Sequence, residues 1–449
     1  MTEPPARAIA SRMWPYHPDL LATPVPRYTS FPTAAEFGTI GSDDYPDALQ
    51  KIEGDVSLYV HIPFCEKICF YCGCNTGAAG RRHRLASYLE ALHREIGTVA
   101  GLLPANTRVS RVAFGGGSPN AVAPADFLRL VEVLTSGFNL VDPIVSIELD
   151  PRTMTREWAS AIAEIGIERA SLGVQTFAEH CQTRIGRVQS EDLILKTTNL
   201  LRKAGVRSLN FDLMYGLPGQ TRADLLDSLQ RTYIFGADRI ALFGYAHVPH
   251  VVPRQKAIDA SDMPDQAERF AMAELGFEHL VGHGYAPVGF DHFAKRGADP
   301  LAHAALGGRL HRNFQGFTDD AAPNLIGLGS SAISAFPHLL AQNEKNSGRY
   351  RMRAAAGQLT ADRGIFRSRD DRIRGSVIEA LLCTGSAELP HHLVAEIRNG
   401  LLPFVERNLA HVDQRRITIA PEGLPYTRTI AALFDPYRRN SPRRFSSAV

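Results

Sequence analysis

The sequence lacks the features that would direct it to a membrane or to nucleic acid. Its 449 residues carry 49 Lys and Arg against 47 Asp and Glu, so the formal net charge is only +2. No apolar run is long enough to cross a bilayer, and the N-terminus has no apolar segment of a secretory signal. We therefore expect a cytoplasmic protein that has no membrane span and binds no nucleic acid.

Cysteine is also scarce, but its distribution is uneven. The chain has 6 cysteines, and Cys65, Cys69, Cys72 and Cys74 lie within one short segment after a predicted strand. The first three form a C-x3-C-x2-C motif, and three neighbouring thiolates suit an iron–sulfur cluster or a soft metal. A structural zinc site usually needs a second pair of ligands, which this sequence does not offer. The pattern favours a cluster over zinc, and zinc over a chance grouping of buried thiols.

Strands and helices alternate through the middle of the chain. Six apolar, β-rich segments are separated by segments of helical periodicity, at residues 57–63, 111–114, 144–149, 169–174, 208–213 and 239–245. Six such units indicate an α/β protein with a parallel sheet. Periodicity alone does not distinguish an open, doubly wound sheet from a barrel. In both, ligands bind at the carboxyl ends of the strands.

The two ends of the chain have a different character. Residues 1–49 are rich in proline and carry aromatic anchors, which indicates an extended N-terminal arm. Residues 50–283 hold the alternating strands and helices. Residues 284–449 are predicted to form a mainly helical C-terminal domain with a late strand at 416–419.

The cysteine motif and its neighbours resemble a known superfamily. C-x3-C-x2-C after a first strand, with Tyr71 before the last cysteine, resembles the radical S-adenosylmethionine (SAM) proteins. The longer phrases YVHIPFC and YCGCN, and PRYTSFPTA in the arm, resemble the oxygen-independent coproporphyrinogen III oxidases. The resemblance implies a partial (βα)6 TIM-like barrel of the radical SAM type, with the arm before it and the helical domain after it.

The resemblance also implies cofactors and the residues that bind them. Cys65, Cys69 and Cys72 would bind a [4Fe–4S] cluster, whose fourth iron would bind SAM. Tyr59 and Cys74 are expected to be catalytic; for Cys74, transient ligation, electron or proton handling and a plain buried thiol all stay open. One SAM is expected at Tyr59, Tyr71, Gly116 and Glu148. A second SAM is expected at Gly117, Ser118, Gln175, Arg187, Asp212 and Ala246, with Ile333 as an apolar contact.

Several of these residues have plausible roles from their chemistry alone. Glu148 ends the third predicted strand, where a carboxylate could bind a ligand or form a surface salt bridge. Arg187 can bind a carboxylate at two points, and Gln175 is both donor and acceptor. Asp212 could accept from ribose hydroxyls or cap the turn that follows it. The glycines of FGGGSPN, residues 114–120, remove side chains where a ligand or backbone must approach.

The function implied is the oxidative decarboxylation of two propionates of coproporphyrinogen III to vinyl groups, which gives protoporphyrinogen IX. The expected partners are an electron donor such as a flavodoxin or ferredoxin system and an unknown electron acceptor. The expected oligomeric state is a monomer. The anionic propionates would suit arginines, and Arg27, Arg309 and Arg312 are the candidates by charge and motif context.

Two alternatives belong to the same superfamily. A haem chaperone would bind and deliver haem without turnover, but such relatives typically lack the fourth cysteine and the arm. A radical SAM methyltransferase or an anaerobic haem-degrading enzyme is the other alternative. The phrases HRNFQGF and DHFAK resemble the C-terminal region of the oxidases and speak against both of these enzymes.

Overall fold

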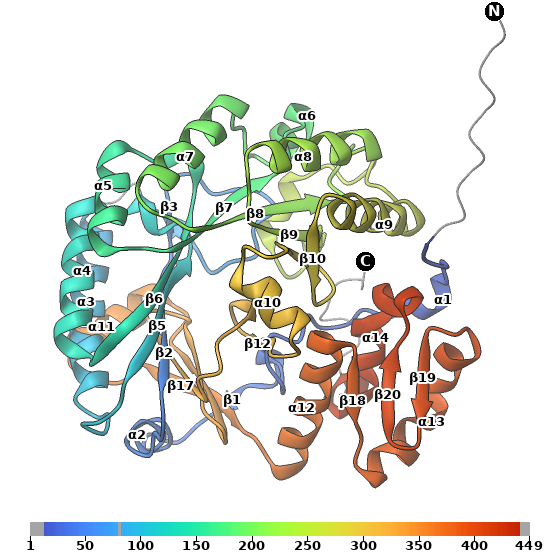
Figure 1. Cartoon of the computed structure of the whole chain (residues 1–449). Helices are drawn as coiled ribbons and strands as arrows, with labels where there is room; N and C mark the ends of the chain where they lie inside the picture. The colour runs from blue at the N-terminus through green and yellow to red at the C-terminus, as the bar shows by residue number, and fades with distance from the viewer. Residues whose placement is uncertain (1–12, 80–81, 441–449) are drawn as a thin grey trace, which may run out of the picture.

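The computed structural model describes residues 13–79 and 82–440, and a sheet of thirteen strands dominates it (Figure 1). The six predicted strands are present and pair in parallel in chain order. They are β2 (Val56–Ile62), β5 (Val109–Gly116), β6 (Leu140–Leu149), β7 (Arg169–Gln175), β8 (Ser208–Tyr215) and β9 (Arg239–Gly244). The sequence prediction of a parallel α/β sheet is therefore confirmed.

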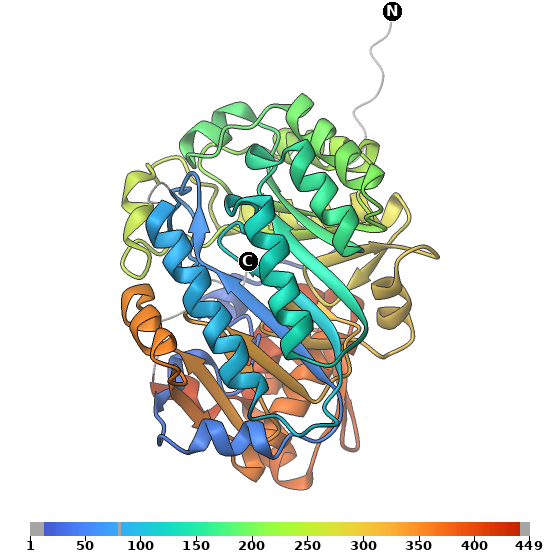
Figure 2. The same cartoon turned by 90° about the vertical axis from the view of Figure 1, so that its left-hand side faces the viewer.

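Helices cover the outer face of these strands, and Figure 2 shows α3 and α4 in front of the sheet. The covering helices are α3 (Arg82–Ala100), α4 (Pro124–Gly137), α5 (Arg156–Ile165), α7 (Glu191–Lys203), α8 (Arg222–Ile234) and α9 (Gln266–Gly282). Ser190 caps α7, because its hydroxyl accepts a hydrogen bond from the Leu193 amide. Each strand–helix unit thus follows the order expected of a barrel.

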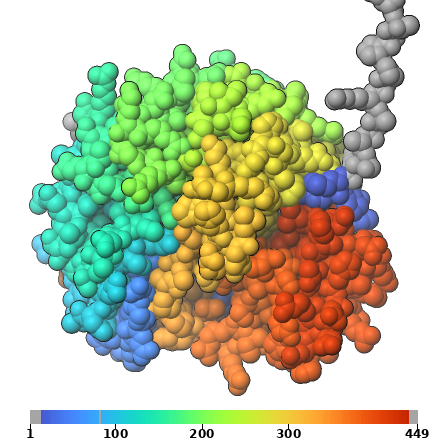
Figure 3. Space-filling model, in the orientation of Figure 1, coloured from blue at the N-terminus to red at the C-terminus, as the bar shows by residue number. Residues whose placement is uncertain are grey.

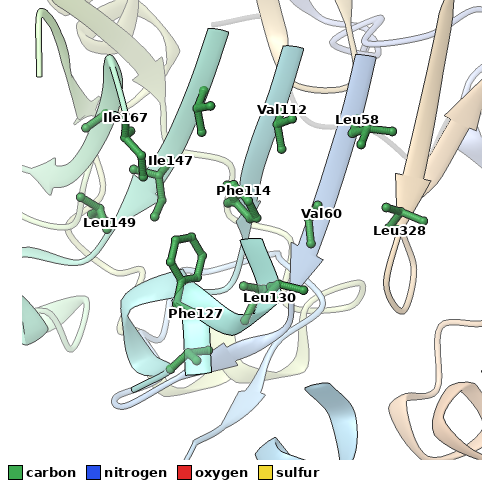
Figure 4. Close-up of a cluster of buried hydrophobic side chains, with 14 of the residues drawn as sticks. Leu58, Val60, Val112, Phe114, Phe127, Leu130, Ile147, Leu149, Ile167 and Leu328 are labelled. Atoms are coloured by element: carbon green, nitrogen blue, oxygen red, sulfur yellow. The ribbon is translucent and has the colours of Figure 1, made fainter. Parts of the chain in front are cut away.

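Alternation along each strand separates an apolar outside from a polar inside. In β2, Leu58 and Val60 are fully buried against the helices, whereas Ser57 and Tyr59 line the barrel interior. Figure 4 shows the outward side chains of neighbouring strands gathered opposite Phe127 and Leu130 of α4. The same alternation places Glu148 of β6 and Asp212 of β8 inside. The strands can therefore hold a hydrophobic core on one face and chemistry on the other.

The sheet extends beyond the six predicted strands on both sides. β14 (Asn324–Leu328) pairs in parallel with β2, and β15 (Ile333–Ala335), β16 (Leu339–Asn343), β17 (Ala361–Phe366) and β1 (Gly38–Thr39) follow antiparallel. The hairpin β10 (Tyr285–Val288) and β11 (His292–Lys295) continues the sheet beyond β9. None of these strands is among the six predicted ones, and the Gly- and polar-rich segments of β14 to β17 lack clear β periodicity.

The arm and the end of the chain pack together, and Figure 3 shows the blue N-terminal segment against the red C-terminal region. The His17 amide donates to the Tyr426 hydroxyl (2.8 Å), and the Tyr28 hydroxyl donates to Asp435 (3.0 Å). The C-terminal region consists of α12 (Arg369–Thr384), α13 (His391–Glu406), α14 (Thr427–Ala431) and a small sheet of β18 (Ser386–Glu388), β19 (Ala410–Asp413) and β20 (Arg416–Ile419). The predicted division at residues 49 and 283 stays a prediction.

Within the described residues, no helix is both long and apolar enough to cross a membrane.

Candidate active site

A cavity of about 260 Å³ opens at the carboxyl ends of the parallel strands. It brings together twelve of the residues singled out in the sequence: Cys65, Cys69, Tyr71, Cys72, Cys74, Gly116, Gly117, Ser118, Glu148, Gln175, Arg187 and Asp212. A second cavity of about 310 Å³ fills the barrel interior and contains Tyr59. Glu148, Ser171, Asp212 and Phe243 line both cavities, so the two are neighbours within one barrel.

The cysteine loop lies over this cavity because a short parallel pair holds its ends. β3 (Phe64–Cys65) pairs with β4 (Gly77–Ala78), and the Phe70 amide donates to the Ile185 carbonyl (3.0 Å). Cys69 is buried, and the guanidinium groups of Arg152 and Arg187 each approach its sulfur to 3.4 Å. A hydrogen bond with Cys74 lowers the pKa of Cys72 to about 6. The same hydrogen bond raises the pKa of Cys74, and burial raises that of Cys65, so the protein's own surroundings favour the thiolate at Cys72.

The donor set fits an iron–sulfur cluster better than a single metal ion. Four free cysteines of one loop line the cavity, and three of them form the C-x3-C-x2-C motif, whose thiolates are the ligands that iron–sulfur clusters use. In the described part of the chain, no group of three or more His, Cys, Asp or Glu side chains converges on one point as ligands of an ion. A [4Fe–4S] cluster needs thiolates spaced around a cube, each on a different iron. The arrangement is therefore compatible with the cluster, whose ligands need not converge on a single ion.

Close contacts at the end of β5 leave no room for a side chain at Gly116 and Gly117. A Cβ on Gly117 would lie 2.5 Å from the Phe64 carbonyl oxygen, and one on Gly116 would lie 2.3 Å from the His61 ring. Gly116 also has a φ of +107°, which disfavours any residue with a side chain. The Gly117 amide donates to the Ile62 carbonyl (2.8 Å), so the segment runs alongside the end of β2. Bare backbone is thereby exposed next to the cysteine loop.

Two carboxyl groups line the cavity, one on β6 and one on β8. The Gly116 amide donates to Glu148 Oε2 (3.1 Å), and the Glu148 side chain is exposed to the cavity. Enclosure by the barrel walls raises the pKa of Glu148 to about 7. Asp212 accepts from the Ser171 hydroxyl (2.9 Å) and the Asn210 amide (2.8 Å), but burial still raises its pKa. A ligand that donates hydrogen bonds or carries positive charge would stabilise the ionised form of both carboxyl groups.

Arg187 is less available than the sequence suggests. Its Nε and Nη2 donate to the Gly173 carbonyl (3.0 and 2.7 Å), and Nη2 pairs with Asp150 (3.3 Å). Asp150 also pairs with Arg152 (2.6 Å). This network fixes the guanidinium beside Cys69. Next to it, Gln175 has a φ of +69° where β7 is irregular against β8, a strain of the kind that accumulates at functional sites.

The structure adds residues that sequence reasoning missed. The Tyr59 hydroxyl lies 3.1 Å from His61 Nδ1, and His61 Nε2 lies 3.4 Å from the Ser331 hydroxyl. The period of two along β2 could have identified His61, because it faces the same side as Tyr59. Burial raises the pKa of Tyr59 and lowers that of His61 to about 4, so both side chains stay neutral at pH 7.

Gln255 is a second missed residue, and no local motif marks it. It is 2% exposed, and its side-chain amide donates to the carbonyl groups of Tyr71 (2.9 Å) and Ala246 (3.1 Å). It therefore joins the cysteine loop to the segment after β9. Ala246 and Ile333 line neither cavity. Ile333 lies on β15, and its backbone packs closely against Gly327 of β14. The ligand contacts expected of both residues stay predictions.

A partial barrel with three loop cysteines and a glycine-rich strand end defines a radical SAM protein, and the comparisons agree. Residues 59–232 match the model of the radical SAM superfamily. Over 426 residues the chain is 38% identical to the oxygen-independent coproporphyrinogen III oxidase of Paracoccus denitrificans, covering 92% of this chain and 94% of that protein. The Escherichia coli protein of the same name is 36% identical, with 94% and 96% covered.

A solved structure gives the same result for the fold. The coproporphyrinogen III oxidase from Escherichia coli, described as a radical SAM enzyme, superposes with a TM-score of 0.89 at 35% identity, covering 95% of this chain and all of that one. The chain therefore belongs to the oxygen-independent coproporphyrinogen III oxidase family. The predicted radical SAM type of the barrel is confirmed.

Proposed function

We propose that this protein converts coproporphyrinogen III to protoporphyrinogen IX by oxidative decarboxylation of two propionates. Each propionate loses a hydrogen from its β-carbon, CO2 and one electron, and becomes a vinyl group. When bound, the reduced [4Fe–4S] cluster and SAM supply the 5′-deoxyadenosyl radical that removes the hydrogen. Family membership over the whole chain carries this proposal, together with the cavity that gathers the cysteines and the SAM-binding candidates.

The residues of the cavity would bind and orient rather than react. Cys65, Cys69 and Cys72 would hold the cluster. Glu148 and the bare backbone at Gly116 suit the ammonium group of SAM, and Asp212 suits ribose hydroxyls. Tyr59, held by His61, would orient the group nearest to it, and its raised pKa keeps it a hydrogen-bond donor.

The site would take two molecules of SAM, as the family resemblance implies. The remaining candidates are Tyr71 for the first molecule and, for the second, Gly117, Ser118, Gln175, Arg187, Ala246 and Ile333. Support comes from the two neighbouring cavities, which share Glu148 and Asp212 in their walls. Cys74 lines the same space as the ligand cysteines, and we assign it a part in proton or electron handling.

The remaining partners follow from this chemistry. Reduction of the cluster needs a low-potential electron donor such as a flavodoxin or ferredoxin system, and the electron released from the substrate needs a separate acceptor. A compartment that keeps thiols reduced, such as the cytoplasm, suits the cluster. The oligomeric state that we propose is a monomer.

The experiment that tests the proposal uses anaerobic protein with its cluster reconstituted. SAM, a reductant, cell extract as electron acceptor and coproporphyrinogen III are added, and protoporphyrin fluorescence after oxidation is followed together with 5′-deoxyadenosine. We expect both products with the wild-type protein and neither with Cys65→Ser. Cys181→Ser is the matched control, because Cys181 is buried outside the cavity and should not affect turnover. SAM cleavage without protoporphyrin would show that coproporphyrinogen III is not the substrate. Tight haem binding without turnover would indicate a haem chaperone.

A further inference from the structure

An aspartate–histidine pair faces the barrel interior. His292 begins β11, and Asp291 precedes it in the turn after β10. His292 Nδ1 lies 2.6 Å from Asp291 Oδ1, which holds the ring with Nδ1 as the donor. The imidazole lines the interior cavity of about 310 Å³, and its side chain is 17% exposed. Among the described residues, Nε2 of this ring has no hydrogen-bond partner.

Aromatic rings hold the imidazole on two further sides. The ring of His292 packs edge to face against Phe243 and against Phe317, with 5.3 Å between the centroids in each case. Both phenylalanines line the interior cavity, and Phe243 also lines the cysteine cavity. With Asp291 bound to Nδ1, Nε2 is the polar atom that the ring can offer to a ligand.

His292 lies at the same level of the barrel as one of the SAM-binding candidates. Ala241 of β9 pairs with Asp212 of β8 on one side and with His292 of β11 on the other. Neighbouring strands are about 5 Å apart, so the backbones at His292 and Asp212 are about 10 Å apart. A ligand atom at Nε2 would therefore lie beside the space expected for the ribose of SAM.

The surroundings of the pair suit an anion at Nε2. Asp291 Oδ2 lies 3.5 Å from Arg27 Nη1, so one carboxylate lies between two cations when the imidazole is protonated. Although burial opposes ionisation, His292, Arg312 and Arg27 lower the pKa of Asp291 to about 2, so it stays charged. The charge of His292 also acts on Asp212, which faces ribose hydroxyls in the proposed function. An anion bound at Nε2 would keep the second proton on the ring.

The other cationic side chains that line the interior cavity already have carboxylate partners. They lie at or near the first residues of their strands, away from the carboxyl ends. They are Arg111 and Arg169, which both pair with Asp319, and Arg239, which pairs with Asp299, each at 2.8 Å. Among the described residues of this cavity, His292 is therefore the cationic group placed to meet a substrate next to SAM.

We propose that His292 Nε2 binds the carboxylate of the propionate that reacts, and that Asp291 is the residue that positions the ring. The inference rests on the proposed function, whose substrate loses two of its four carboxylates. In a propionate the carboxyl carbon is two bonds from the β-carbon, so a carboxylate held at Nε2 presents the β-hydrogen to the neighbouring SAM space. The vinyl product has no carboxylate at this position, so the contact is lost when CO2 leaves.

The three arginines that the sequence offered for the propionates have other surroundings. Arg27 pairs with Asp291. Arg312 of β12 (His311–Asn313) donates to the Arg27 carbonyl through Nε and Nη2 (3.2 and 3.0 Å). Arg309 is exposed and lies in an outer hollow. None of the three lines the interior cavity, so their binding of propionates stays a prediction.

The test compares the binding of two porphyrins to holoenzyme by fluorescence quenching. Coproporphyrin III, the stable oxidised form of the substrate, carries four carboxylates, whereas protoporphyrin IX lacks those of the two reacting propionates. We expect His292→Gln to raise the Kd of coproporphyrin III about tenfold to a hundredfold and to change that of protoporphyrin IX by less than about twofold. The matched control is His392→Gln, because His392 lies beside Asp370 outside both cavities and should affect neither Kd.

Asp291→Asn tests the positioning role and keeps the test valid if His292→Gln does not fold. The amide oxygen of Asn can still accept from Nδ1, but it no longer stabilises a charged ring, so the preference for coproporphyrin III should fall by less, about threefold to tenfold. In both variants the KM for coproporphyrinogen III should rise in parallel with the Kd. Cleavage of SAM by dithionite without substrate should stay at the wild-type rate, which shows that the fold and the cluster are intact.

Equal weakening of both porphyrins would show that His292 only supports the fold, and it would overturn the inference. A His292→Gln variant with the wild-type preference and KM would also overturn it, while turnover of coproporphyrinogen III by the wild-type protein would leave the proposed function standing. A wild-type protein that cleaves SAM but neither binds nor converts the porphyrin would refute the proposed function, and the inference with it.

Discussion

At the scale of single residues, the site combines groups whose protonation is set by enclosure. Glu148 has a pKa of about 7 because the barrel walls enclose it, although the Gly116 amide donates a hydrogen bond to its carboxylate. Tyr59 and His61 are held neutral by burial. A carboxyl group with a pKa near 7 changes its protonation when a ligand binds. A bound ammonium group would favour the charged form and lower the pKa again.

The raised pKa of Glu148 predicts how SAM binding depends on pH. Below pH 7 Glu148 becomes protonated and loses its attraction for the ammonium group, so the affinity for SAM should fall by up to about tenfold for each pH unit. Isothermal titration of holoenzyme between pH 6 and pH 8 measures this. Glu148→Gln should bind SAM weakly with a flat profile over the same range. A wild-type profile as flat as that of the variant would contradict the assignment.

The same pKa shift has a consequence for stability. Because the folded pKa lies above the ordinary value of 4.5, the contribution of Glu148 is present at low pH and is lost as the pH rises through about 7. In the absence of SAM, Glu148→Gln should therefore gain Tm relative to wild type at pH 8 compared with pH 5. Thermal melts at the two pH values provide the measurement.

At the scale of elements, one buried carboxylate ties helix α3 to the strands that the sequence did not predict. Glu95 accepts from the Gly329 amide (2.6 Å) and the Tyr350 hydroxyl (2.7 Å) through Oε2, and from Asn343 (2.8 Å) and Thr360 (3.1 Å) through Oε1. These partners follow β14, lie on α11 (Ser347–Ala355) and β16, and precede β17. The network fixes the turn after β14, from which Ser331 reaches His61.

Glu95→Gln should weaken this junction, because an amide group cannot accept hydrogen bonds through its nitrogen. At least one oxygen's pair of donors loses its acceptor, and we expect the free energy of unfolding to fall by about 1–3 kcal/mol. Urea unfolding at pH 7 measures the change. Glu90→Gln on the exposed side of the same helix is the control and should stay within about 0.5 kcal/mol of wild type. Equal effects of the two substitutions would show that the network contributes nothing of its own.

At the scale of the whole molecule, the segment after the barrel closes the end opposite the cysteines. Asp319 follows β13 (Gly316–Thr318) and binds Arg111 of β5 (2.8 Å) and Arg169 of β7 (2.8 Å). Burial opposes its ionisation, but the hydrogen bonds and charges of Arg169 and Arg111 hold the pKa of Asp319 well below its usual range. A residue far along the chain thus bridges two strands of the barrel.

Asp319→Asn should lower the free energy of unfolding by about 3 kcal/mol at pH 7, since it removes the ion pair of Arg169 and leaves Arg111 only the longer contact with Asp320 (3.4 Å). Because the folded pKa of Asp319 is depressed, its stabilisation exists above about pH 4 and is lost as the pH falls. The difference between variant and wild type should therefore shrink at pH 3. Urea titrations at both pH values test this, with the exposed Asp413→Asn as control. A difference that is as large at pH 3 as at pH 7 would point to packing rather than charge.

The sequence by itself determined the elements whose signals are local. The six strands of the barrel follow from apolar, β-rich periodicity over a few residues, and so does the late strand at residues 416–419. The cysteine motif likewise predicts its own chemistry, the binding of an iron–sulfur cluster, because its three thiolates are close in the chain. Parallel strands place their carboxyl ends together, so Glu148 and Asp212 could be expected in one cavity.

Only the tertiary structure decided which distant residues meet. Gln255 bridges Tyr71 and Ala246, Glu95 binds four segments, and Arg312 donates to the Arg27 carbonyl in the arm. No local pattern marks these side chains, because their partners lie far away in sequence and the contacts exist only once the barrel has closed. For the same reason the sequence could not separate the exposed Arg309 from Arg312, which packs against the arm: charge is visible in a sequence, whereas burial is a property of the folded chain.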